Sequence, residues 1–128
     1  MKVRLACICF LFPVLYASAQ DNTDSLRKII AVTADPARRA DLLLQLSNAY
    51  RYSSPDSSFF YSKQAVKIIQ PLNDSGRLAN AEVYQCYYYY NTGKPDSGLQ
   101  LAEKNIAWLE KRPDLLPQLA NYYSFSGL

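Results

Sequence analysis

The sequence predicts an all-α protein built from antiparallel helix pairs that are stacked in series. The first observation is a repeat: the segment 53–69 returns forty residues later, and its Pro-Asp-Ser at 55–57 recurs at 95–97. The second is the spacing of apolar residues, which follow one another at three- and four-residue steps as on one face of a helix. A period of this size with helical patterning inside it indicates stacked helix pairs.

Residues 1–19 have the three parts of a secretory signal peptide. Lys2 and Arg4 precede an apolar run over 5–16, and the small residues 17–19 form a cleavage site. The run is shorter than the roughly 20 residues of a membrane-spanning helix. This pattern favours a signal peptide over the alternative of a buried N-terminal helix. We expect export to the periplasm or the extracellular space after cleavage near Ala19, and membrane contact only through this segment or a downstream anchor.

Residues 20–36 are predicted to form an N-terminal capping helix. Its inner face has three apolar residues, Leu26, Ile29 and Ile30. Ile29 aligns with Ile69 and Leu109 when the sequence is shifted by the repeat period. We therefore expect this helix to be half a repeat that covers the open end of the stack, as terminal repeats do.

Residues 37–73 are predicted to form the first complete repeat. Ser54 is an N-cap candidate and Pro55 follows at the first helical position, so the second helix of the pair is expected to begin there. The first helix has an apolar face made of Leu42, Leu43, Leu46, Ala49 and Tyr50. The second helix has a stripe of small side chains, which lets its partner approach closely: Ser58, Ser62 and Ala65.

Residues 74–113 are predicted to form the second repeat, and 114–128 the first helix of a truncated third one. The alignment places Tyr87 and Tyr90 of the second repeat in the core. In the last helix Pro117 fits the first turn. If this helix ends without a C-cap and without a partner helix, four of its large residues are not covered: Leu115, Leu119, Tyr122 and Tyr123. The sequence is therefore expected to be a fragment of a longer chain.

Over residues 24–128 the sequence resembles the tetratricopeptide repeat (TPR) family. Leu46, Ser47 and Tyr50 match the large, small and aromatic residues of that family's first helix, and Ser58 and Ala65 match two small residues of its second helix. The corresponding residues of the second repeat are Cys86, Tyr87, Tyr90, Gly98, Ala102 and Asn105, of which Tyr87 and Asn105 are larger than the pattern prefers. The resemblance implies a right-handed TPR-like α-solenoid.

The resemblance also implies a concave groove that is lined by the first helix of each repeat. Carried over to this sequence, the groove residues are Asp41, Leu44, Asn48, Arg51, Tyr52, Ala81, Tyr84, Tyr88, Asn91, Asn121 and Ser124. Tyrosine suits peptide recognition because it combines a large area with few rotamers and a hydroxyl group. The alternative is that Tyr84 and Tyr88 only pack between repeats. The family's clamp for C-terminal carboxylates is not expected, since Leu44 and Gln85 occupy two of its positions.

The composition excludes the commonest kinds of catalytic site. The chain has no histidine, so it cannot pair a nucleophile with a histidine base or bind a metal through histidine. Cys86 is expected to pack inertly in the core. Loss of Lys2 and Arg4 reduces the 14 basic residues to 12, against 11 acidic ones, which leaves too little charge for nucleic-acid binding. No enzyme activity, metal or cofactor is expected.

We therefore expect a non-catalytic scaffold that binds a protein or peptide, while its oligomeric state stays open. In the Gram-negative bacterial proteins that this one resembles, such regions often form the extracytoplasmic part of a sensor kinase or of a membrane-tethered regulator, so a sensory or interaction segment of a larger signalling protein is expected. The alternative is a docking or spacer arm of an exported enzyme whose catalytic domain lies beyond residue 128.

Overall fold

In the computed structural model, the backbone is described for residues 12–127 and the side chains for residues 22–127. The elements are α1 (Phe12–Val32), α2 (Pro36–Tyr50), α3 (Pro55–Ile69), η1 (Gln70–Leu72), α4 (Ser75–Asn91), α5 (Pro95–Leu109), η2 (Pro113–Leu115) and α6 (Leu116–Ser126). No strand occurs in this described range, and adjacent helices pack against each other. The prediction of an all-α fold is confirmed.

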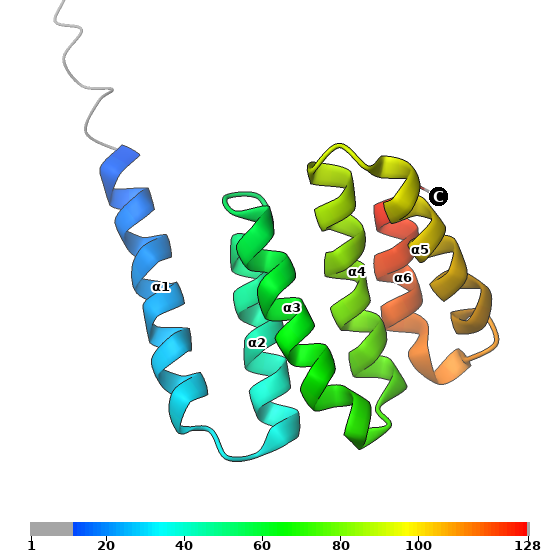
Figure 1. The fold of residues 1–128 in the computed structure, drawn as a ribbon, viewed down its shortest axis with the longest axis horizontal. Coiled ribbons are helices and arrows are strands. Elements are labelled where there is room, and N and C mark those ends of the chain that lie inside the picture. Colours follow the sequence, from blue (N-terminus) through cyan, green and yellow to red (C-terminus); the bar gives the residue numbers. More distant parts are fainter. Residues whose placement is uncertain (1–11, 128) are drawn as a thin grey trace, which may run out of the picture.

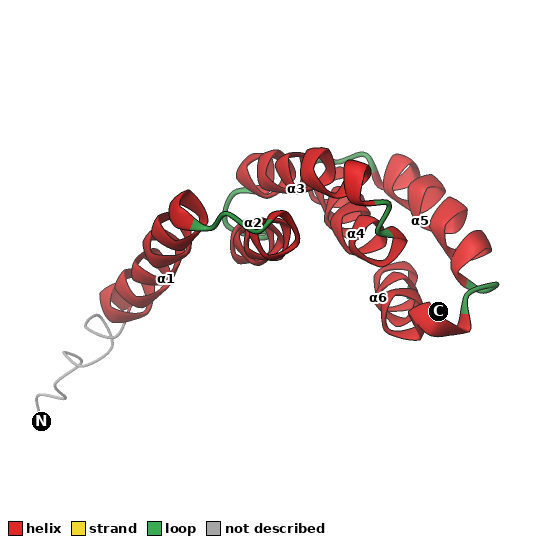
Figure 2. Ribbon diagram, turned by 90° about the horizontal axis from the view of Figure 1, so that it is seen from below, coloured by secondary structure: helices red, strands yellow, loops and turns green. Residues whose placement is uncertain are grey.

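The helices form an arc with an inner and an outer side. Successive helices run in opposite directions (Figure 1). Seen from below, α2, α4 and α6 lie along the inner side of the arc, while α3 and α5 lie along its outer side (Figure 2). Helix α1 lies at one end of the arc, where it packs against α2. Three helices of the same direction therefore share the concave face.

The outer helices α3 and α5 both begin at a proline, as predicted. Pro55 and Pro95 are the first residues of these helices, where the fixed φ of proline is already helical and its missing N–H is not needed. Ser54 lies at the N-cap of α3, but its hydroxyl is hydrogen-bonded to the Ser57 hydroxyl at 2.8 Å and caps no backbone N–H.

The inner helices α2 and α4 are capped by aspartates instead. The Asp35 carboxylate accepts a hydrogen bond from the Arg38 backbone N–H at 2.8 Å, and Asp74 accepts one from the Arg77 backbone N–H at 2.9 Å. Each satisfies a donor that the first turn of a helix leaves unpaired.

The small-residue stripe of α3 lies at the interface with α2. Ser58, Ser62 and Ala65 are buried there, and the Ser47 hydroxyl of α2 donates to the Ser58 carbonyl at 2.8 Å. Helices can approach this closely only where side chains are small. The role predicted for this stripe is confirmed.

In the second pair, α4 is shifted by one residue relative to the forty-residue repeat. Cys86 lies against Gly98, whose Cβ, if it had one, would be 2.8 Å from the Cys86 carbonyl oxygen. This contact is the counterpart of Ser47 against Ser58, although the repeat aligned Ser47 with Tyr87. The chain has one residue more from Cys86 to Gly98 than from Ser47 to Ser58. In this register Cys86, and not Tyr87, holds the position that Ser47 holds in the first pair.

Asn105 is the centre of a buried polar network between α4, α5 and α6. Its side-chain NH₂ donates to Glu82 at 2.8 Å and to the Tyr122 hydroxyl at 3.0 Å, and its carbonyl accepts from the Trp108 indole at 2.9 Å. Tyr122 in turn donates to the Ala79 carbonyl at 2.8 Å. Both donors and the acceptor of the Asn105 carboxamide are therefore paired.

Helix α6 is capped, and two of its four residues that were expected to be uncovered are buried. Leu119 and Tyr122 are buried against the second pair. Gly127 has φ +75 and its N–H donates to the Tyr123 carbonyl at 3.0 Å, as in a left-handed helix cap.

Two single residues lie elsewhere than predicted. Tyr90 is 59% exposed and is no core residue, because the shift of α4 turns it outward. In α1, Ile29 is 42% exposed while Ile30 is buried, so Ile29 is not the equivalent of Ile69.

Helix α1 begins earlier than the capping helix predicted from the sequence. Its first residue is Phe12, so the predicted cleavage site at 17–19 lies within the helix. The basic residues Lys2 and Arg4 of the predicted signal peptide lie outside the described residues. Arg27 attaches α1 to the first pair, since its guanidinium donates to the hydroxyls of Tyr50 and Tyr61.

Candidate functional site

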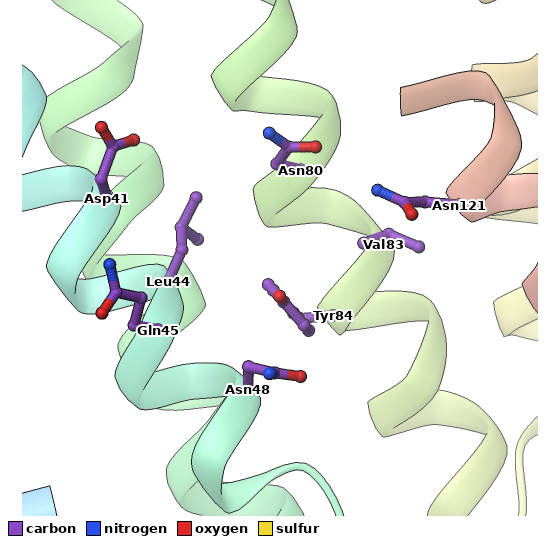
Figure 3. A pocket seen from close by; sticks show the side chains of 8 residues that line it. All are labelled: Asp41, Leu44, Gln45, Asn48, Asn80, Val83, Tyr84 and Asn121. Carbon is purple, nitrogen blue, oxygen red and sulfur yellow. The ribbon is translucent and has the colours of Figure 1, made fainter. Parts of the chain in front are cut away.

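The concave face contains a hollow of about 310 Å³ between the inner helices. Helix α2 contributes four side chains to its lining, α4 contributes three and α6 one: Asp41, Leu44, Gln45, Asn48, Asn80, Val83, Tyr84 and Asn121. Figure 3 shows the side chains of α2 and α4 on facing sides, with Asn121 reaching in from α6. The floor is apolar, since Leu44 and Val83 are buried.

Four carboxamides surround this floor: Gln45, Asn48, Asn80 and Asn121. Each carries both donors and acceptors of hydrogen bonds. Within the described residues, none of these four side chains is hydrogen-bonded to another protein group, in contrast to the fully used carboxamide of Asn105. The four groups are therefore available to a ligand.

Asp41, at the edge of the hollow, is held by an arginine of α4. The Arg77 guanidinium donates to both oxygens of Asp41, at 2.8 and 3.0 Å, and also to the N-cap residue Asp74. These carboxylates raise the pKa of Arg77 above its usual value. The arrangement joins the first turns of α2 and α4 and gives the Asp41 carboxylate a cationic partner, which it shares with Asp74.

A smaller hollow of about 100 Å³ continues toward the C-terminal ends of the inner helices. Its lining is Arg51, Val83, Tyr84, Tyr87, Asn121 and Ser124. The Arg51 guanidinium carbon lies 4.6 Å from the ring centre of Tyr52 and 4.5 Å from that of Tyr87, as in cation–π contacts. Burial raises the pKa of the Tyr84 hydroxyl, which therefore stays protonated and can donate a hydrogen bond.

The structure brings seven of the eleven groove residues expected from the sequence into these two hollows. Asp41, Leu44, Asn48, Tyr84 and Asn121 line the larger one, and Arg51, Ser124 and again Tyr84 and Asn121 line the smaller one.

The other four expected groove residues line neither hollow. Ala81 is fully buried in the core, and Tyr52 is exposed beside Arg51. Asn91 donates to the Arg51 backbone carbonyl at 3.1 Å. Tyr88 stacks on Phe59 of α3 with ring centres 4.3 Å apart, which is the packing role named as its alternative.

Sequence reasoning missed four lining residues, Gln45, Asn80, Val83 and Tyr87. In α4 the equivalent positions come one residue earlier than the forty-residue repeat predicts. Asn80, Val83 and Tyr84 are the equivalents of Asp41, Leu44 and Gln45 in α2. The sequence signal for this shift was the one additional residue between Cys86 and Gly98, compared with the segment between Ser47 and Ser58.

Among residues 12–127, no helix is both long and apolar enough to cross a membrane. The same part of the chain has no group of three or more acidic or cysteine side chains placed to hold a metal ion. Comparisons with protein-family models, curated proteins and solved structures gave no match.

Proposed function

We propose that this protein is a non-catalytic, TPR-like scaffold, a right-handed solenoid whose concave face binds an extended segment of a partner protein or a peptide. The observation that carries the proposal is the set of four unpaired carboxamides from three helices around Tyr84. A peptide backbone presents alternating donors and acceptors, which carboxamides can match in either direction.

The hollow suits such a ligand in shape as well. Its volume of about 310 Å³ is at the lower end of the range for ligand pockets, roughly 300–1,000 Å³. Leu44 and Val83 offer an apolar floor for one side chain, and Tyr84 adds a half-buried aromatic ring beside it. Binding pockets commonly combine such a floor with a few polar groups that fix orientation.

The proposed setting is outside the cytoplasm, where the scaffold would act as the sensory or interaction segment of a larger signalling protein. Its support is the pattern of charge, apolar run and small residues over 1–19. Mass spectrometry of the protein secreted by a Gram-negative host tests the setting, since cleavage near Ala19 gives a defined mass.

Binding is tested by selecting peptides from a random 12-residue phage library against the complete chain. Affinities of the selected peptides are then measured by fluorescence anisotropy with Gln45→Ala, Asn121→Ala and Tyr84→Ala variants. Each substitution is expected to weaken binding about two- to tenfold, which corresponds to the free energy of one hydrogen bond or aromatic contact. The matched control is Gln100→Ala, which shortens an exposed glutamine on the outer helix α5. Equal binding by the groove variants and the control contradicts the proposal.

A further inference from the structure

We propose that Arg51 selects partner segments with an acidic side chain, whose carboxylate it binds in the smaller hollow. This inference rests on the proposed function, because it assigns one specificity determinant within that same concave face. It differs from the family clamp considered above, which receives a chain terminus through other positions.

Arg51 is a cation without a carboxylate partner. The ion pairs among the described residues join Arg27 to Asp24, Arg77 to Asp41 and Asp74, and Arg112 to Asp114. Within the same residues, the Arg51 Nε is buried and has no hydrogen-bond acceptor. Buried N–H groups are nearly always paired in folded proteins, so this one indicates that an acceptor binds there.

The two tyrosines beside Arg51 prepare its guanidinium for a carboxylate. Tyr52 and Tyr87 lie within 4.6 Å of its central carbon, measured to their ring centres. Contacts through the face of a guanidinium occupy none of its five N–H donors, which all lie in its plane. A side chain that is already held in place loses less freedom when it binds.

The rest of the smaller hollow also favours a negative charge. Tyr84, Asn121 and Ser124 line it with groups that can donate hydrogen bonds, and no acidic residue is part of its lining. Asp41, the acidic residue of the larger hollow, is ion-paired with Arg77. A carboxylate entering beside Arg51 therefore meets a cation and groups that can donate hydrogen bonds, and no acidic side chain of this lining.

The ligand group assigned to this hollow of about 100 Å³ is a side-chain carboxylate. Aspartate and glutamate are the negatively charged side chains of an unmodified peptide, and their planar carboxylates can accept two parallel hydrogen bonds from a guanidinium edge. We therefore assign aspartate or glutamate, and the response to inorganic phosphate becomes an outcome of the test.

The first test uses small probes and the complete chain. The Nε–H resonance of Arg51, assigned with the Arg51→Lys variant, is followed by NMR while N-acetylglutamate α-amide is added. A saturable shift is expected, with at most one-fifth of that shift for N-acetylglutamine α-amide at the same concentration. No shift, an equal shift with both probes, or a shift with inorganic phosphate alone overturns the assignment.

The second test uses the peptides selected from the phage library. Aspartate or glutamate is expected at one fixed position, and its replacement by the amide should weaken binding about tenfold in the natural protein but less than twofold in Arg51→Gln. Lys104→Gln, which removes an exposed cation from α5, should keep the tenfold preference. Peptides that bind the concave face without any acidic preference overturn the role of Arg51 but keep the proposed function. Failure of every peptide to bind overturns the proposed function, and the probe experiment then decides the carboxylate site alone.

Discussion

The Asn105 carboxamide donates a hydrogen bond to the Tyr122 hydroxyl at 3.0 Å and so joins α5 to α6 inside the protein. Tyr122→Phe removes this contact, leaves one N–H of the buried Asn105 carboxamide without an acceptor, and removes the hydroxyl that donates to the Ala79 carbonyl. We expect a loss of about 1–3 kcal/mol in the free energy of unfolding, measured in urea, since a buried polar group is left unpaired. Tyr123→Phe is the control, because its hydroxyl donates to Glu110 at an exposed position. An equal loss in both variants would contradict the importance of the network.

Asp74 makes stability depend on pH. The Arg77 backbone N–H, aided by the Arg77 side chain, holds the pKa of this carboxylate below its usual value. Its stabilising effect is therefore complete above the unfolded-state pKa of about 3.9 and is lost as the pH falls through the lower folded-state pKa. We expect the free energy of unfolding to decrease between pH 7 and pH 3, and to decrease less in Asp74→Asn, which keeps a capping side chain without the charge.

The control for this measurement is Glu103→Gln, which removes an exposed carboxylate from the middle of α5. It should show the same acid-induced decrease as the natural sequence. If Asp74→Asn loses stability on acidification as steeply as this control, the capping carboxylate is not the source of the effect.

Gly98 is needed where α5 approaches α4. A Cβ at this position would lie 2.8 Å from the Cys86 carbonyl oxygen, and a backbone atom cannot move aside cheaply. Gly98→Ala is therefore expected to cost about 1–3 kcal/mol, despite the better helix propensity of alanine. Gly76→Ala is the comparison, because its Cβ would meet the flexible end of Leu115 at 3.1 Å. It should change the free energy of unfolding by less than about 1 kcal/mol.

Cys86 should be chemically inert while the protein is folded. Burial raises the pKa of its thiol to about 12, and only the thiolate reacts readily. In a Cys7→Ser, Cys9→Ser background, alkylation by iodoacetamide at pH 8 should be roughly a thousandfold slower than in denaturant, given an ordinary thiol pKa of about 8.5. Similar rates in both conditions would show that α4 opens readily.

Substitution of Tyr84 should affect peptide binding, whereas substitution of Tyr88 should affect stability. Tyr88 stacks on Phe59 across the contact of α3 and α4, so Tyr88→Ala is expected to lower the free energy of unfolding by about 1–3 kcal/mol without weakening peptide binding. Tyr84→Ala should weaken peptide binding at nearly unchanged helicity. Urea denaturation and anisotropy with the selected peptides measure the two effects, and loss of binding in the Tyr88 variant would reverse this assignment.

The starts of the outer helices and the small-residue interface could be predicted from the sequence because each follows from a local rule. Proline at a first helical position presets the backbone, so Pro55 and Pro95 mark the two starts without any knowledge of the packing. Ser62 and Ala65 have a spacing that keeps small side chains on one face of a helix, and that face is buried against α2.

The one-residue shift of α4 could not be predicted because it depends on contacts between helices. A repeat period read from the outer helices assigns Ala81 and Tyr88 to the concave face, whereas the close contact of Cys86 with Gly98 turns α4 so that Asn80 and Val83 lie there. The network around Asn105 was missed for a similar reason, since its partners come from three different helices.

The buried position of Tyr122 has a practical consequence for anyone shortening this protein. A version that stops at Arg112 would lack both hydrogen-bond partners that the tyrosine supplies and would bare the apolar surface of Ala79 and Cys86 to water. Such a version is expected to aggregate, so expression trials should retain α6 together with its C-cap residue Gly127.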